Sequence, residues 1–156
     1  MIDKTKIGMN YTLTWQQLKT NFPNSLPHYK KKEVETIKRF VQLSILPGTY
    51  SFDVRLPYEL TDREKNLPEP EQKMMISLKS MRIDAIIETN NEIWIIEVCK
   101  GLELSYTGKI LGYTDLYKTI FKPNKPVKMG VVGIDDNVLA RRALENMGIK
   151  IWLVSI

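Results

Sequence analysis

The first regular pattern along the chain is an amphipathic stripe within Lys31–Leu43 and just after it. Apolar residues recur there every three or four positions, as they do on one face of a helix. These residues are Val34, Ile37, Val41 and Ile45. Pro47-Gly48 follows and favours the end of a helix. The pattern therefore predicts a helix over Lys31–Leu43.

Extended segments come next. Tyr50–Leu56 alternates apolar and polar residues closely enough to predict a strand. Residues 57–72 hold three prolines and many charges, which predicts a loop longer than most loops in compact domains. Met74–Thr89 and Glu92–Cys99 read as two further strands. The two residues between them, Asn90-Asn91, are typical of a tight hairpin turn, because asparagine tolerates the positive φ that such turns need.

The last third of the chain alternates helices and strands. Gly108–Phe121 reads as a helix that Ser105 or Thr107 caps, and Val127–Ile134 reads as an apolar strand. A helix capped by Asp135 or Asp136 and ending at Gly148 leads to a final strand over Ile149–Ile156. The element order is α-β-β-β-α-β-α-β. This order predicts an α/β fold with a mixed central β-sheet flanked by helices.

Residues 1–30 differ from this pattern and predict an N-terminal arm before a domain formed by residues 31–156. The arm holds aromatic residues and prolines but only one short candidate helix, over Thr14–Thr20, which Thr14 can cap. We expect the arm to pack on the domain or on a partner, either another copy of the chain or other proteins of an assembly.

Composition narrows the class of protein. The 156 residues are 43% apolar and 26% charged, as in an average globular domain. No apolar run approaches the ~20 residues that span a bilayer, and Met1–Lys4 lacks the layout of a secretory signal. We expect a cytosolic protein with no membrane partner. The net charge of +5 permits contact with nucleic acid.

Single cysteine and histidine residues exclude several kinds of site. Cys99 can form no intrachain disulfide, and no zinc site built on several cysteines is possible. Because His28 is the one histidine of the sequence, mechanisms that need two histidines are excluded. We expect His28 at the surface. Cys99 has no histidine nearby in sequence to act as its base, so we expect a small apolar core residue.

The hairpin register brings two acids together. If Asn90 and Asn91 form the turn, paired residue numbers sum to 181, and Asp84 lies across from Glu97. Arg82 and Asp84 then share a face with Ile86, Ile93, Ile95, Glu97 and Cys99, while the other face is apolar and includes Ile83. Like charges directly opposite repel, and partial burial strengthens the repulsion.

Something must compensate this repulsion. A divalent cation is one answer, because Mg²⁺ and Mn²⁺ typically bind one or two carboxylates and fill their other positions with water and phosphate. Such an ion polarises a phosphodiester and lowers the pKa of water. A proton shared between the two acids is a second answer. The third is that Arg82, next to Asp84 on the same face, neutralises the pair and no metal is needed.

The stretch Arg82–Lys100 resembles the core of the PD-(D/E)XK nuclease superfamily, in which an Asp on one strand and an acid-x-Lys on the next bind metal and activate water. Gly108–Tyr117 is similar to the helix that follows this motif. The resemblance covers residues 31–156, and it is nearest to small nuclease-like proteins of tailed bacteriophages. It implies a restriction-endonuclease-like fold, Mg²⁺ or Mn²⁺ at Asp84 and Glu97, DNA as partner, and a location in the host cytoplasm or the virion.

The sequence departs from this family where the lysine is expected. It reads Glu97-Val98-Cys99-Lys100, so regular alternation gives Cys99 the lysine's place and turns Lys100 toward the apolar face. A β-bulge at Cys99 would return Lys100 to Glu97. Lys109 in the next helix could replace it, or Arg82 could supply the charge without acting as a base. Otherwise catalysis is lost.

Other residues could contribute to such a site. The first helix of the superfamily can lend an acid to the metal, which makes Glu33 and Glu35 candidates, although Glu35 lies off the apolar stripe and is expected in solvent. Tyr113 packs the core or lines the cleft. Basic residues that could contact phosphates of a nucleic acid are Lys30, Lys31, Lys32, Arg82, Arg141 and Arg142.

Two functions fit the sequence. The first is a metal-dependent DNA nuclease with Asp84 and Glu97 as ligands and Lys100 or Lys109 as the catalytic lysine. The second is a degenerate copy of the fold, without metal, that serves as a structural virion component such as a head-completion, neck or head-tail connector protein. The retained acids favour the first, and the displaced lysine favours the second.

Overall fold

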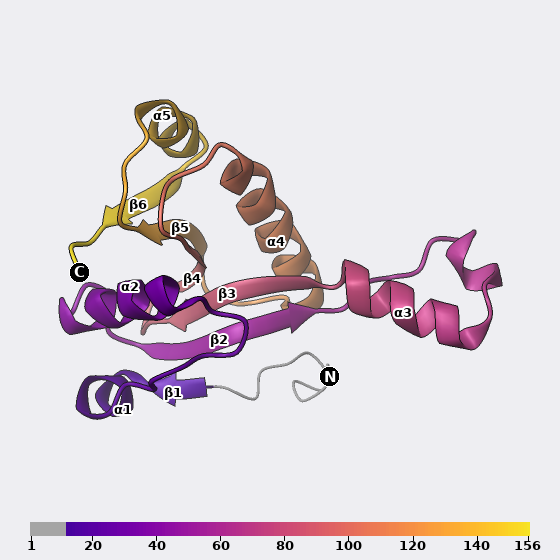
Figure 1. Ribbon diagram of the computed structural model, residues 1–156, viewed down its shortest axis with the longest axis horizontal. Helices are drawn as coiled ribbons and strands as arrows, with labels where there is room; N and C mark the ends of the chain where they lie inside the picture. Colours follow the sequence, from indigo (N-terminus) through magenta and orange to yellow (C-terminus); the bar gives the residue numbers. More distant parts are fainter. Residues whose placement is uncertain (1–11) are drawn as a thin grey trace.

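A computed structural model describes residues 12–156, which form a mixed six-stranded sheet flanked by helices (Figure 1). The strands lie in chain order: β1 (Thr12–Thr14), β2 (Thr49–Leu56), β3 (Met81–Glu88), β4 (Ile93–Val98), β5 (Val127–Gly133) and β6 (Ile149–Leu153). The helices are α1 (Trp15–Thr20), α2 (Lys31–Gln42), α3 (Glu69–Lys79), α4 (Ser105–Phe121) and α5 (Val138–Asn146), with a short 3₁₀ turn at Glu64–Asn66. Strands β1 to β4 pair antiparallel, and β4 to β6 pair parallel.

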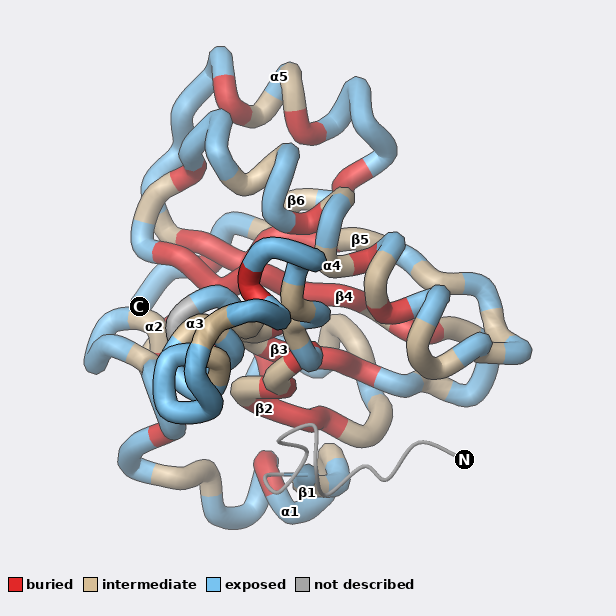
Figure 2. Tube along the Cα trace, turned by 90° about the vertical axis from the view of Figure 1, so that its right-hand side faces the viewer, coloured by how far each residue is buried: buried red, intermediate tan, exposed pale blue. Residues whose placement is uncertain are grey.

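Helices cover both faces of this sheet (Figure 1). On one face α1 and α2 pack their buried residues, among them Leu18, Ile37 and Phe40, against the strands. On the other face α4 and α5 pack, through Ile110, Tyr117 and Leu144. Burial is concentrated on the central strands (Figure 2). The predicted α/β class with a mixed sheet between helices is confirmed.

The described part of the N-terminal arm packs on its own domain. β1 pairs with β2, and Thr14 caps α1, as predicted, by accepting a hydrogen bond from the Gln17 amide. Residues 1–11 of the predicted arm lie outside the described residues. Among residues 12–156, no helix is both long and apolar enough to cross a bilayer.

Two predicted helix starts were wrong. α4 begins at Ser105, and neither Ser105 nor Thr107 caps it. α5 begins at Val138, where the side chain of Asn137, rather than of Asp135 or Asp136, accepts a hydrogen bond from the Ala140 amide. Asn137 is the residue in extended conformation that directly precedes the helix, and this position defines an N-cap.

The prediction of an extended segment from Met74 was wrong, because α3 occupies Glu69–Lys79. Pro70 favours the first turn of a helix, and Glu69 and Glu71 place negative charge at its positive end. The apolar run that resembled a strand is not buried: Met74 is 51% exposed and Ile76 39%. α3 instead extends away from the sheet at the end of the long β2–β3 connection (Figure 1).

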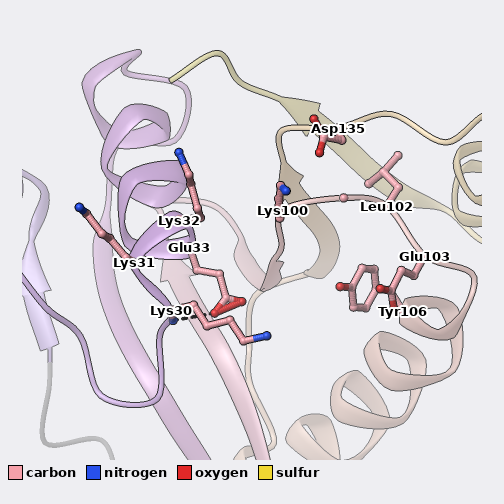
Figure 3. Close-up of a pocket in the computed structure, with 10 residues that line it drawn as sticks. Lys30, Lys31, Lys32, Glu33, Lys100, Leu102, Glu103, Tyr106 and Asp135 are labelled. Carbon is pink, nitrogen blue, oxygen red and sulfur yellow. Dashed lines mark hydrogen bonds between the residues drawn. The ribbon is translucent and has the colours of Figure 1, made fainter.

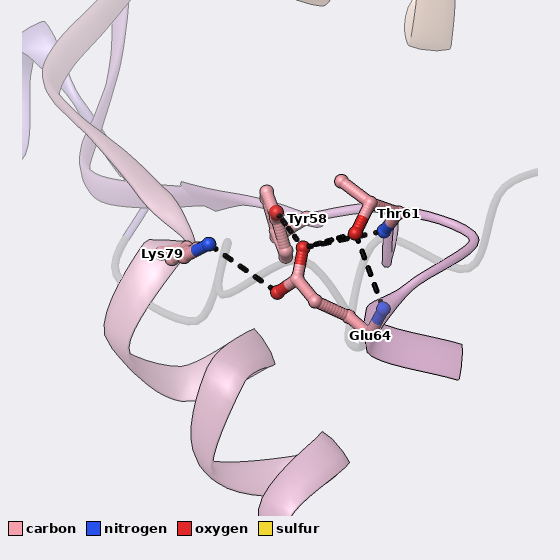
Figure 4. A network of polar contacts seen from close by, with 4 residues as sticks. All are labelled: Tyr58, Thr61, Glu64 and Lys79. Carbon is pink, nitrogen blue, oxygen red and sulfur yellow. Dashed lines mark hydrogen bonds and ion pairs between the residues drawn. The ribbon is translucent and has the colours of Figure 1, made fainter. Parts of the chain in front are cut away.

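A polar cluster closes the base of this extension (Figure 4). The buried carboxylate of Glu64 accepts hydrogen bonds from the hydroxyls of Tyr58 (2.6 Å) and Thr61 (2.8 Å), and Lys79 lies 3.3 Å away as its ion-pair partner. These hydrogen bonds lower the pKa of Glu64 to about 2. Both carboxylate oxygens of Glu64 have partners, so we assign the cluster a structural role. It joins the start and the end of the β2–β3 connection.

Strands β2 and β3 change faces together at Asp53 and Asp84. Phe52 pairs with Ala85 and Val54 with Ile83, so Asp53 lies across from Asp84. Phe52 and Ala85 pack on the α2 side, whereas Val54 and Ile83 pack on the α4 side. The prediction that Ile83 lies on the opposite face from Ile86 was therefore wrong, because both pack on the α4 side. The physical cause is Asp53, whose φ of 49° breaks the alternation of the strand.

Candidate functional site

The register predicted for the β3–β4 hairpin is confirmed. Pairs from Glu88↔Ile93 to Ala85↔Ile96 all sum to 181, as the Asn90-Asn91 turn requires. Asp84 and Glu97 follow directly after the last pair. At that point the two strands stop pairing, so the acids lie at the opening between them.

Asp84 is held at two points. Its carboxylate accepts a hydrogen bond from the Val98 amide at 2.8 Å, and its backbone carbonyl accepts one from the Tyr29 hydroxyl. The carboxylate thus takes an amide of β4 that a continued ladder would have paired with the backbone of β3. The Val98 amide therefore fixes the orientation of the Asp84 carboxylate.

Glu97 is buried without full hydrogen bonding. The residue is 9% exposed, and its Oε2 atom accepts no hydrogen bond from a donor group in residues 12–156. Its carboxyl group does lie within hydrogen-bonding reach of that of Asp84. A buried polar oxygen without a partner costs about 1–3 kcal/mol, and more when it is charged. Native proteins rarely leave such an atom unsatisfied unless a ligand or proton serves it.

Burial raises the pKa of both acids. For Asp84, burial dominates, and the negative charge of Glu33 adds to it, while the Val98 amide opposes it. For Glu97, burial again dominates, followed by the negative charge of Asp84. Lys109 lowers both pKa values. The pair therefore retains protons near neutrality unless another positive charge arrives.

Arg82 does not neutralise the pair, and that alternative was wrong. Its guanidinium lies 3.7 Å from Asp53 and contacts the Nε2 atom of His28. No ion pair joins it to Asp84 or Glu97 within residues 12–156. The change of faces at Asp53 turns Arg82 toward the α1–α2 connection. His28 is exposed, as expected, and its Nδ1 atom lies 2.8 Å from Asp53.

The two candidate lysines differ in position. The β4–β5 ladder runs regularly through Val98, and the Cys99 amide continues it to Val132, so no bulge returns Lys100 to Glu97. Lys100 lies beyond the end of β4 and is exposed rather than turned into the apolar core. Lys109, on α4, carries a positive charge that lowers the pKa of both acids.

Cys99 occupies the expected lysine position as a core residue. It is 2% exposed and packs with Leu102, Ile110 and Val131. Burial raises the pKa of its thiol to about 12. Its prediction as a small apolar core residue is confirmed.

An open cavity of about 520 Å³ lies between the start of α2, the segment after β4 and the start of α4 (Figure 3). It brings together basic residues from the start of α2 and from the segment that follows β4: Lys30, Lys31, Lys32 and Lys100. Glu33 and Tyr106 also line it. Glu33 also acts on the acidic pair, because its negative charge adds to burial in raising the pKa of Asp84 and Glu97. Burial raises the pKa of Tyr106, and nearby acids that include Glu97 and Asp84 add to this effect.

Of the other residues predicted for the site, one lies near the acidic pair and three do not. Glu35 pairs with Lys32 at 3.6 Å on the exposed side of α2, as expected of a surface acid. Tyr113 lies near the site, because the charges of Glu97 and Asp84 raise its pKa after burial does. Arg141 and Arg142 lie on α5, where Arg141 pairs with Asp136 at 3.5 Å, and neither lines the cavity.

A divalent cation fits the donor set. Asp84 and Glu97 offer carboxylate oxygens, one of them buried and without a partner, and Mg²⁺ prefers oxygen ligands. Within residues 12–156, no three acid, histidine or cysteine side chains converge as a complete cage. Mg²⁺ does not require one, because it usually keeps several waters and binds one or two carboxylates.

Sequence reasoning did not find Tyr29 or Tyr106. Tyr29 lies in the connection before α2, 55 positions from Asp84 in sequence, and no motif marks it. Tyr106 was one aromatic among several near the start of α4. Comparison with known proteins adds no assignment: the chain matches no protein-family model, no curated protein and no solved structure.

Proposed function

We propose that this protein is a metal-dependent nuclease with a restriction-endonuclease-like fold, which hydrolyses phosphodiester bonds of DNA at Asp84 and Glu97. The observation that carries the proposal is the pair itself. Two carboxylates lie in register where β3 and β4 separate, and no donor within residues 12–156 bonds the buried Oε2 atom of Glu97. A divalent cation would satisfy that oxygen and offset the repulsion between the acids.

The surrounding residues suit this chemistry. A cation held by Asp84 and Glu97 would supply Lewis acidity toward a phosphodiester and a lowered pKa for water. Lys109 places a positive charge beside the developing negative charge. Lys30, Lys31, Lys32 and Lys100 would bind the phosphates of a strand in the adjoining cavity. The Val98 amide orients the Asp84 carboxylate.

The test is cleavage of plasmid DNA with Mn²⁺ or Mg²⁺. We expect the wild type to nick or linearise the plasmid, Asp84→Ala to abolish cleavage, and EDTA to abolish it too. Asp62→Ala is the matched control, because the Asp62 side chain is fully exposed on the loop before α3. Cleavage that survives in Asp84→Ala, or no cleavage by the wild type with either metal, contradicts the proposal.

One observation favours a second function. Cys99 fills the position where the resembled family places its lysine, and Lys100 faces the cavity instead. If Lys109 does not replace the missing lysine, the fold would serve as a structural component of a phage particle, for example in head completion or at the neck. Absence of cleavage together with a stable ring or complex in size-exclusion chromatography would support this function.

A further inference from the structure

We propose that the connection between α1 and α2 is part of the site, and that Tyr29 is a positioning residue that fixes Asp84 for metal binding while His28 anchors the connection. This inference rests on the proposed function and deepens it. In this inference, two residues outside the β3–β4 hairpin hold Asp84, a residue of the hairpin, in the orientation that metal binding needs.

The contact of Tyr29 is with the Asp84 backbone. Its hydroxyl donates to the carbonyl of Asp84, which lies where β3 changes faces and stops pairing with β4. The Tyr29 ring packs edge-on against Phe52 at 6.0 Å between ring centroids, which holds it in place. Tyr29 thus supplies a hydrogen bond to a carbonyl at the point where the β3–β4 ladder ends.

Asp84 is consequently fixed from two directions. The Val98 amide holds its carboxylate, and Tyr29 holds its main chain. Outer partners of metal ligands typically account for 10- to 100-fold in metal affinity, because they set the orientation of the ligand. Without Tyr29, Asp84 keeps the hydrogen bond to its carboxylate but not the one that fixes its backbone.

A second cluster anchors the connection. His28 and Asp53 both have positive φ, at 62° and 49°, and their side chains meet at 2.8 Å. Arg82 contacts both. Positive φ in residues other than glycine persists only where surrounding contacts determine it. These three side chains therefore join the connection to β2 and β3 one residue before Tyr29.

The experiment compares two tyrosines. Tyr29→Phe removes one hydroxyl that donates to a backbone carbonyl. Tyr50→Phe is the matched control, because the buried Tyr50 hydroxyl donates to the Leu46 carbonyl at 2.8 Å and does not contact the acidic pair. Mn²⁺ binding is measured by calorimetry and by electron paramagnetic resonance, and thermal unfolding is measured without metal.

We expect both variants to lose similar thermal stability, but only Tyr29→Phe to weaken Mn²⁺ binding, by about 10-fold or more. DNA cleavage by Tyr29→Phe should recover at saturating Mn²⁺. Equal Mn²⁺ affinity in Tyr29→Phe and Tyr50→Phe overturns the inference and leaves the proposed function intact. A wild type that binds no Mn²⁺, or binds it equally in Asp84→Ala, overturns both.

A second variant decides the question if Tyr29→Phe does not fold. His28→Gly allows the same positive φ, which glycine adopts without strain, and removes the whole side chain including the imidazole. We expect it to weaken Mn²⁺ binding in the same direction, by several-fold, because the anchor of Tyr29 is removed. Unchanged affinity in His28→Gly would contradict the anchoring role.

Discussion

The Val98 amide donates to the Asp84 carboxylate at 2.8 Å, across the gap where β3 and β4 stop pairing. Regular strands would have joined their backbones here. Instead the side chain of Asp84 takes the amide. Glu97, which precedes Val98 on β4, is buried, and no donor group in the described part of the chain reaches its Oε2 atom. Because the strands separate here, the two carboxyl groups lie between them instead of backbone hydrogen bonds.

The separation depends on Asp53 as much as on Asp84. The two lie across from each other, and both strands change faces at this point. Asp53 also holds His28 and Arg82, which keeps Arg82 away from the acidic pair. Within residues 12–156, no arginine therefore forms an ion pair with Asp84 or Glu97.

The acidic pair should make stability fall as pH rises in the absence of divalent metal. The folded pKa values of Asp84 and Glu97 are raised to about 7 and about 8, from 3.8 and 4.5. Between these limits the folded state holds more protons than the unfolded state, so the free energy of unfolding decreases with pH. Chemical denaturation at pH 5 and pH 8 measures this effect.

Mn²⁺ should reverse the loss at pH 8, by about 2.7 kcal/mol at 100 times its dissociation constant. The double variant Asp84→Asn, Glu97→Gln is the control, because its amides have the shape of the protonated acids and do not titrate. It should show neither the loss with pH nor the gain with Mn²⁺. The same pH dependence in this variant would assign the effect to other groups.

Lys109 should be the catalytic lysine, and Lys100 should not. Lys109→Met removes the positive charge that acts on both acids, so we expect cleavage to fall about 100-fold or more at saturating DNA. Lys118→Met, also exposed and on α4, is the matched control. Single-turnover rates measure the effect. A larger loss in Lys100→Met than in Lys109→Met would contradict this assignment.

The hairpin register could be predicted because a two-residue turn determines which residues pair. The face change could not, since positive φ at Asp53 is set by contacts with His28 and Arg82 from distant segments. Alternation therefore placed Arg82 beside Asp84 and Ile83 on the wrong face. α3 was missed because its consecutive apolar residues suggested a strand, although no packing surface buries them.

The residues of the candidate site could likewise be predicted only where they are close to one another in sequence. Asp84 and Glu97 were found because both lie on one hairpin, and Lys109 because it follows closely on the next helix. Glu33 was one of two acids predicted on the helix that the structure shows as α2. Its distance from Asp84 and Glu97 depends on how α2 crosses the sheet, which the sequence does not show. Tyr29 gave no signal at all, because the path of an irregular connection is decided by tertiary contacts such as the one between Tyr29 and Phe52.

The cavity lysines should bind nucleic acid through its phosphates. We expect the triple change Lys30→Gln, Lys31→Gln, Lys32→Gln to weaken DNA binding and to lower the slope of log K against log salt by about 0.9 for each phosphate that the variant no longer neutralises. Lys38→Gln, Lys118→Gln, Lys150→Gln is the control, with the same change in net charge at exposed positions outside the cavity. Filter binding at several salt concentrations distinguishes a local site from a general effect of charge.

Cys99 should be dispensable for chemistry. Its thiol pKa, raised to about 12 by burial and then by the charge of Glu97, leaves about one thiolate in ten thousand at pH 8. Its Sγ atom lies so near Gly133 that a Cβ there would approach it to 2.9 Å, which marks close packing rather than a reactive position. We expect Cys99→Ala to keep full cleavage and to lose about 1 kcal/mol of stability. Alkylation by iodoacetamide should be slow in the folded protein and fast in denaturant. Rapid alkylation of the folded chain, with loss of cleavage in Cys99→Ala, would instead make the thiol part of the reaction and overturn its assignment to the core.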